Sequence, residues 1–183
     1  MCASTPTSRA WASAPEQPAS GLRQLDLELL RCARSLGHDA ARDRAVARFS
    51  ALGQHAGVWL AIGGAASVVS RGEARARWRH ATALVAASYA LNTGLKFAVG
   101  RQRPELAGLP ALVATPTQLS FPSAHATTGF AAARAFSRLG APRLPLYALA
   151  GSLALSRLYL GVHYPSDVLA GALLGTLVGE LAP

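Results

Sequence analysis

Four apolar segments of near membrane-spanning length, separated by polar or proline-marked breaks, constrain the fold of this chain most strongly. They cover residues 55–70, 80–99, 144–161 and 168–182. A bilayer core needs roughly 17 to 25 helical residues, so the first and last segments must borrow flanking residues to span it. Only 15% of the residues are charged, against 51% hydrophobic, which is unusual for a soluble protein. Together with a further helix over residues 125–139, the pattern predicts an all-α, integral-membrane bundle of about five helices.

The N-terminal part of the chain differs from these segments. Residues 1–21 are rich in Ser, Pro, Ala and Thr without an apolar period, which predicts a disordered tail ahead of a membrane domain over residues 22–183. Residues 22–36 interleave leucines with charged side chains and predict an amphipathic helix. This helix is too charged to span a bilayer, and the pattern leaves two places for it, the membrane interface or the surface of the helical core.

Charge and cysteine content limit the classes of partner and cofactor. The formal net charge of +9 suits a nucleic acid, an anionic membrane surface or an anionic substrate. We expect no nucleic-acid partner, because aromatic residues do not interleave with the arginines and the hydropathy favours a membrane. Cys2 and Cys32 have neither zinc nor disulfide spacing, and we expect no metal cofactor. A homo-oligomer remains open.

Glycines recur at every fourth residue of the last apolar segment, at Gly171, Gly175 and Gly179. Residues four apart share one face of a helix, and a face without side chains lets a second backbone approach closely. We therefore expect this helix to pack tightly against a neighbour.

Three polar clusters interrupt the apolar chain, each at the end of a predicted helix. They cover residues 96–104, 120–125 and 156–167. Ionisable groups at membrane depth are costly and occur mostly at functional sites. Snorkelling to the membrane surface explains the basic run over residues 71–79, but it does not explain two histidines and a carboxylate. We expect the three clusters to converge on one pocket.

The cationic residues of these clusters suit a phosphoryl group. Lys96, Arg103 and Arg157 supply fixed donors for its non-bridging oxygens, and Lys96 is the only lysine in the chain. Ser123 shortly precedes a predicted helix start, where its hydroxyl either holds an anion or caps the helix. These four are the candidate phosphate-binding residues.

The remaining polar residues suit covalent catalysis. His163 and Asp167 flank Pro165 at a turn, where the carboxylate can hold one ring nitrogen and leave the other as a nucleophile. His125 lies on a different predicted helix and is free to protonate a leaving oxygen. The catalytic candidates are therefore His163, His125 and Asp167. We expect the other three histidines in the core or facing solvent: His38, His55 and His80.

The combined motifs K-x6-R-P at residues 96–104, P-S-[GA]-H at 122–125 and S-R-x5-H-x3-D at 156–167 resemble the type 2 phosphatidic acid phosphatase superfamily. Bacterial acid phosphatases and vanadium haloperoxidases belong to the same superfamily. The resemblance covers roughly residues 50–180. It implies an all-helical core, catalysis without a metal, and a phosphohistidine on His163, with Asp167 orienting it and His125 as the acid. It assigns the phosphate to the remaining motif residues: Lys96, Arg103, Ser123 and Arg157.

One position departs from the family pattern. Ala124 stands where the family usually has glycine before the histidine of the second motif. If the backbone there needs a positive φ, alanine costs about 1 kcal/mol or more. Every chemical group of the motifs is kept, so we expect the enzyme to tolerate the change.

The expected activity is hydrolysis of a phosphomonoester or diphosphate of a lipid-linked substrate. The runs SALGQHAGVW and ATPTQLSFPSAHAT are similar to decaprenylphosphoryl-phosphoribose phosphatases of the cell-wall arabinose-donor pathway. Undecaprenyl-diphosphate and phosphatidylglycerophosphate phosphatases share the same motifs and remain alternatives. A vanadate-dependent haloperoxidase and a non-enzymatic membrane scaffold are more distant ones.

The basic run over residues 71–79 predicts the topology. Short loops rich in Lys and Arg stay cytoplasmic, so this run, between two apolar segments, is expected inside. Residues 80–99 then cross outward, and the later helices bring all three polar clusters to the outer side. We expect a multi-pass protein of the cell membrane with its active site on the outer face.

Overall fold

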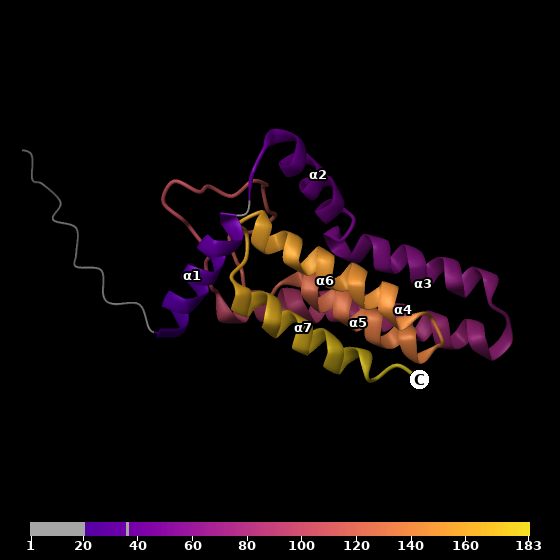
Figure 1. The fold of residues 1–183 in the computed structure, drawn as a ribbon. Coiled ribbons are helices and arrows are strands. Elements are labelled where there is room, and N and C mark those ends of the chain that lie inside the picture. Colours follow the sequence, from indigo (N-terminus) through magenta and orange to yellow (C-terminus); the bar gives the residue numbers. More distant parts are fainter. Residues whose placement is uncertain (1–20, 36) are drawn as a thin grey trace, which may run out of the picture.

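The computed structural model describes residues 21–35 and 37–183, so the predicted tail over residues 1–21 lies outside it except for Gly21, which begins a helix. The described residues form helices and no named β-strand, and the all-α prediction is confirmed (Figure 1). The elements are α1 Gly21–Arg34, α2 Ala40–Ala51, the 3-10 helix η1 Gln54–Ala56, α3 Gly57–Val69, α4 Gly72–Val99, α5 Ala124–Arg138, α6 Arg143–Tyr159 and α7 Pro165–Gly179.

Helix α5 forms the centre of the bundle. It packs against α4, α6 and α7, and Figure 1 shows the four helices side by side. Its alanine-rich sequence buries small side chains on most of its surface, and Phe136 contributes the large one. Around α5 the core is completed by Trp59 of α3, Val85 of α4 and Leu153 of α6. Helix α5 is therefore buried on several sides.

The glycine face of α7 lies directly on α5. A Cβ atom added at Gly171 would come within 2.6 Å of the Ser123 carbonyl oxygen, and one added at Gly179 within 2.7 Å of the Ala131 carbonyl oxygen. Either side chain would push the two helices apart. The predicted close packing is confirmed, and it fixes the start of α7 against the start of α5.

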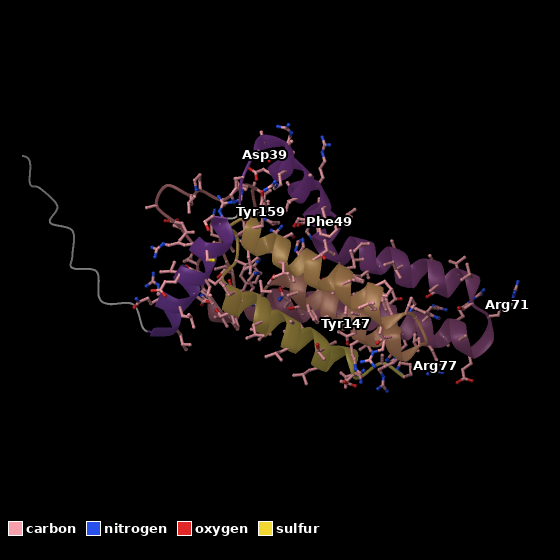
Figure 2. All side chains as sticks on the ribbon, viewed as in Figure 1. Asp39, Phe49, Arg71, Arg77, Tyr147 and Tyr159 are labelled. Atoms are coloured by element: carbon pink, nitrogen blue, oxygen red, sulfur yellow. The ribbon has the colours of Figure 1, made fainter. Side chains whose placement is uncertain are left out.

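The alternating helix directions bring the polar clusters to one end of the bundle. Helices α4 and α6 end where α5 and α7 begin, and the loop over residues 100–123 lies at this same end (Figure 1). Arg71 and Arg77, at the start of α4, lie at the opposite end from Tyr159, the last residue of α6 (Figure 2). The polar clusters and the basic run are therefore separated by the length of the bundle.

Helix α1 packs on the core through one face. Leu30 is fully buried, Asp26 and Arg34 are nearly so, and α1 contacts α6 and α7. Arg34 donates to the Tyr159 carbonyl oxygen at 2.8 Å, which satisfies the C-terminal end of α6. Leu22 and Leu25 on the other face are exposed. The structure shows contact with the helical core through one face of this helix, and its other, leucine-bearing face is exposed.

Two helical segments differ from the sequence prediction. Helix α2 was not predicted, because its sequence AARDRAVARFSA has no wide apolar face; Asp39 caps it by accepting from the N–H groups of Ala41 and Arg42. Helix α4 begins at Gly72, eight residues before the predicted start, so the basic run is helical and not a loop. Alanine and arginine are strong helix formers, and local propensity extends both segments beyond the apolar pattern.

The longest helix of this fold is not apolar along its whole length, and its apolar helices are short. No helix in the described part of the chain is, by itself, both long and apolar enough to cross a bilayer, whereas α2 and the segment Gln54–Val69, bent by 49° relative to each other, meet that criterion as a pair. Helix α4 has 28 residues but carries the basic run, and α7 is apolar but has 15 residues.

Candidate active site

Five of the seven predicted site residues line one cavity of about 100 Å³ at the end of the bundle where the clusters meet. These residues are Lys96, Arg103, His125, Arg157 and His163. Ser123 and Asp167 lie directly behind them, both without exposed surface, and the Ser123 N–H donates to the Asp167 carbonyl oxygen at 3.0 Å. The structure thus brings the three clusters together, as the sequence predicted.

His163 lies in the turn between α6 and α7 with its ring buried. Its Nδ1 is 3.5 Å from Asp167 Oδ2, and its Nε2 is 3.3 Å from Arg103 Nη1. A guanidinium only donates, so Nε2 is the acceptor and the ring hydrogen lies on Nδ1, facing the carboxylate. The separation of 3.5 Å is too long for a good hydrogen bond, a looseness common in catalytic pairs before substrate binds. The Nε2 lone pair is thus directed toward Arg103.

Burial sets the protonation of this side of the cavity. Desolvation lowers the pKa of His163 to about 4, although the Asp167 carboxylate opposes the shift. The imidazole is therefore neutral at pH 7. Burial also lowers the pKa of Arg103, to about 10, and it remains a cation. Arg103 donates to the carbonyl oxygens of Thr117 at 2.9 Å and Val162 at 2.6 Å, so its hydrogen-bond partners carry no negative charge.

His125 and Arg157 share a partner that the sequence analysis missed, Ser50 of α2. The Nε2 of His125 lies 2.9 Å from the Ser50 carbonyl oxygen, so this nitrogen carries a hydrogen and Nδ1 is left for proton exchange. Arg157 Nη1 donates to Ser50 Oγ at 2.7 Å. A lone serine in a polar segment gives no signal of its own, but Ser50 begins the run SALGQHAGVW.

Besides His163 Nδ1, two buried donors beside the cavity have no hydrogen-bond partner in the described part of the chain, Ser123 Oγ and Arg157 Nε. Ser123 occupies the N-cap position of α5, yet its side chain makes no capping hydrogen bond. Of its two predicted alternatives, capping is therefore not seen. A buried polar atom left unpaired costs about 1–3 kcal/mol and calls for an explanation such as a ligand. An anion in the cavity would satisfy both donors.

Lys96 fastens the loop that precedes α5. Its Nζ lies 3.2 Å from the Leu119 carbonyl oxygen, 3.3 Å from that of Ser120 and 3.1 Å from that of Pro122. An ammonium group has three hydrogens, so these acceptors use its whole donor capacity. Lys96 therefore contributes positive charge to the cavity and holds the loop in position.

Arg101 is the site residue that the sequence analysis left without a role. Its Nη1 donates to Asp167 Oδ1 at 2.8 Å, and its Nη2 donates to Asp26 Oδ2 at 2.7 Å. Ser166 joins the same network, because its N–H donates to Asp26 Oδ1 at 2.9 Å. A buried carboxylate of α1 is thus connected to the carboxylate that faces His163. The position of Arg101 inside the K-x6-R-P motif was the available signal.

Ala124 does not strain the site. It is the first residue of α5, and it is not among the residues with positive φ. The non-glycine residues with positive φ in the described part of the chain are His55 and Ala56. His55 is exposed, within the range predicted for it. The described residues contain no group of three or more His, Cys, Asp or Glu side chains arranged to hold a metal ion.

Comparison with known proteins gives the same family as the motifs. Residues 77–182 match the family model described as the PAP2 superfamily. The chain is 44% identical over 134 residues to the decaprenylphosphoryl-5-phosphoribose phosphatase of Mycobacterium tuberculosis (strain CDC 1551 / Oshkosh), with 72% of this chain and 73% of that protein covered. It is 40% identical over 129 residues to the phosphatase of the same name from Mycolicibacterium smegmatis, covering 70% and 68%.

A solved structure supports the fold. The crystal structure titled the first transmembrane PAP2 type phosphatidylglycerolphosphate phosphatase from Bacillus subtilis superposes with a TM-score of 0.73 at 22% identity, covering 88% of this chain and 84% of that one. At this identity the likeness concerns the fold alone. The family model, in contrast, matches more than half of this chain. The chain belongs to the PAP2 superfamily.

Proposed function

We propose that the protein is a lipid phosphatase that works without a metal, through a covalent phosphohistidine on His163. The observation that carries the proposal is the buried, neutral imidazole of His163, whose Nε2 lies beside Arg103 in a cavity lined by three cations. A neutral imidazole is a nucleophile, and fixed cations stabilise the charge that develops on a transferring phosphoryl group. The unpaired donors of Ser123 and Arg157 suit its oxygens.

In the first step, Nε2 of His163 attacks phosphorus, and the P–N bond forms as the P–O bond to the substrate breaks. Asp167 stabilises the positive charge that appears on the ring. His125, which takes up a second proton together with the anionic substrate, gives its Nδ1 proton to the leaving oxygen. The remaining residues hold or neutralise the non-bridging oxygens: Lys96, Arg103, Ser123 and Arg157.

In the second step, water attacks the phosphorus of the phosphohistidine. His125 is now neutral at Nδ1 and takes a proton from this water, while the P–N bond breaks and phosphate leaves. The enzyme returns to its starting protonation state. Each histidine thus acts in both halves of the reaction.

Decaprenylphosphoryl-5-phosphoribose is the proposed substrate. The two mycobacterial relatives are named for this compound and align with 72% and 70% of the chain. The test offers the purified protein, in detergent with EDTA, decaprenylphosphoryl-5-phosphoribose, undecaprenyl diphosphate and phosphatidylglycerophosphate, and compares kcat/KM. We expect the first substrate to rank highest and EDTA to have no effect. Metal dependence, or no phosphate release from any lipid, would contradict the proposal.

The proposed location is the cell membrane, with the cavity on the outer face. The basic start of α4 and the arginines at the end of α5 lie at the end of the bundle away from the cavity, as the positive-inside rule requires for that end to be cytoplasmic. The exposed residues Glu105 and Glu73 mark the two ends. Cysteine at Glu105, but not at Glu73, should react with an impermeant maleimide in intact cells of a Cys2→Ser, Cys32→Ser strain. The reverse labelling would put the cavity in the cytoplasm.

A further inference from the structure

We infer that the cavity has a second half, formed by Gln54, His55 and Tyr89, that binds the hydroxyl groups of a sugar next to the phosphate. The inference rests on the proposed phosphatase function and adds what the site prefers beyond the phosphate. None of these residues belongs to the three sequence motifs.

The three side chains share the cavity of the phosphate site. They line it together with His163 and Arg103. Nδ1 of His55 lies 2.7 Å from the Tyr89 hydroxyl oxygen, and Nε2 of Gln54 lies 3.4 Å from Nε2 of His55. They therefore form one polar surface and not three separate contacts.

Helix α4 connects this surface to the cations. Tyr89, Thr93 and Lys96 all line the cavity, and their spacing of four and three residues puts them on one face of the helix. Seven residues of helix rise about 10 Å, so Tyr89 stands roughly 10 Å along the helix axis from Lys96. That length leaves room for a small group beyond the phosphate.

The segment that carries Gln54 and His55 is fixed against the proposed acid. A Cβ atom added at Gly53 would lie 2.6 Å from Cδ2 of His125, so this backbone rests directly on the imidazole ring. The next residues hold an unusual conformation, with φ of 50° at His55 and 61° at Ala56. Left-handed non-glycine residues cost about 1 kcal/mol or more each and cluster at functional sites. The surrounding structure must fix this costly conformation, in which His55 lies beside Tyr89.

The chemistry of the three side chains favours hydroxyl groups over a second phosphate. An amide, an imidazole and a phenol supply donors and acceptors, and none of them is a permanent cation. Sugar hydroxyls are both donors and acceptors, so they match this surface. A second phosphate would need fixed positive charge, and the cations that line the cavity belong to the other half, Lys96, Arg103 and Arg157.

Two synthetic substrates would test the inference. Both carry a farnesylphosphoryl group and a terminal phosphate, joined through ribose in one and through an unbranched five-carbon chain in the other. We expect the wild-type protein to prefer the ribose compound. Tyr89→Phe, which leaves the strained backbone untouched, should lower kcat/KM for it by about 3- to 10-fold, the worth of one hydrogen bond. kcat/KM for the pentyl compound should stay within about twofold.

His55→Ala is the second variant, and His80→Ala is the matched control, since His80 is exposed and lies near the start of α4, away from the cavity. We expect the first to repeat the Tyr89→Phe result and the second to change neither substrate. An unaltered ribose preference in both Tyr89→Phe and His55→Ala would overturn the subsite, and so would an equal loss on both substrates. Release of phosphate from neither compound by the wild-type protein would overturn the proposed function itself.

Discussion

Both ends of the bundle are rich in arginine, but the two arginines that line the cavity differ from those at the opposite end in burial and in their partners. At the cavity end, Arg103 and Arg157 are largely withdrawn from water, and their hydrogen-bond partners are carbonyl oxygens, a serine and an imidazole. At the other end, Arg134 and Arg138 pair with Glu180 near the surface. Arg71 and Arg77 project at this end in Figure 2. A buried arginine without a carboxylate partner can direct its positive charge at a ligand. The charge of an exposed arginine is screened by water, and that of a paired arginine is neutralised by its carboxylate.

The size of the hollow does not distinguish the end that carries the candidate active site from the basic end. A hollow of about 220 Å³ lies at the basic end, lined by Arg77, Trp78 and Arg138, and it contains no histidine and no carboxylate. Water screens charges there, and electrostatic catalysis needs fixed charges in a site that excludes water. The difference predicts that equivalent substitutions at the two ends have very unequal effects.

Loss of the nucleophile should have the largest effect. His163→Ala removes the atom that forms the P–N bond, so we expect no turnover above a trace, measured as phosphate release. His125→Ala should instead accumulate a phosphoenzyme or turn over slowly, because the nucleophile remains. Radiolabelled substrate and an acid-labile label on the protein would distinguish these results. Substantial activity in His163→Ala would refute the covalent mechanism.

An arginine pair compares the two ends directly. Arg157→Ala removes a buried donor and should lower kcat/KM by about 100- to 1000-fold, whereas Arg77→Ala, at the exposed end, should change it by less than about twofold. Vanadate adopts the five-coordinate geometry of phosphoryl transfer and should inhibit the wild-type protein and Arg77→Ala. Persistent vanadate inhibition in Arg157→Ala would mean that this cation does not bind the phosphoryl group.

The sequence predicted the fold where hydrophobic periodicity carried the signal. The four apolar segments match α3, α4, α6 and α7, and the glycine spacing predicted how α7 meets α5. It failed for α2, which forms by local propensity and the Asp39 cap without an apolar stripe. The same cause hid the helical start of α4. Helix propensity and hydrophobic periodicity are separate signals, and α2 carries only the first.

For the site, the motifs gave the residues that carry charge or a nucleophile, but not the residues that hold them. Ser50 is 106 residues from Ser156 in sequence, and Asp26 is 75 from Arg101, yet each pair is in hydrogen-bonding contact. Contacts of this range follow from tertiary packing and leave no spacing to recognise. Asp26 and Ser50 both lie on the helices before the apolar segments.

The Asp26–Arg101–Asp167 network should have an intermediate effect. Asp26→Asn keeps the size of the side chain but removes the charge that Arg101 bridges to Asp167. We expect kcat to fall by about tenfold with KM unchanged, because Asp167 positions His163 and does not touch substrate. Asp26→Glu should recover part of the loss. A rise in KM with constant kcat would instead place Asp26 in substrate binding.

Protonation of His163 gives a smaller, titratable effect. With its pKa lowered to about 4 by burial, less than about a tenth of the rings should be protonated at pH 5.5. The unfolded chain binds this proton near pH 6.5, so stability should fall as the pH drops from about 6.5 to 4 and rise again in the reverse direction. NMR of nitrogen-labelled imidazoles, assigned with His163→Gln, would measure the ring directly. Titration near pH 6.5 would show that the ring is hydrated.

The exposed ion pair at the basic end should matter least. Arg134 holds Glu180 through two hydrogen bonds of 2.7 and 2.8 Å, but the glutamate side chain is 44% exposed. Water and salt screen such a pair, so Glu180→Gln should lower Tm by less than about 2 °C and leave kcat/KM unchanged. In about 1 M salt the difference in Tm between the wild-type protein and Glu180→Gln should vanish, because the Debye screening length is then roughly 3 Å. A large loss of activity in Glu180→Gln would mean that the two ends are coupled through α7, and that burial alone does not divide their roles.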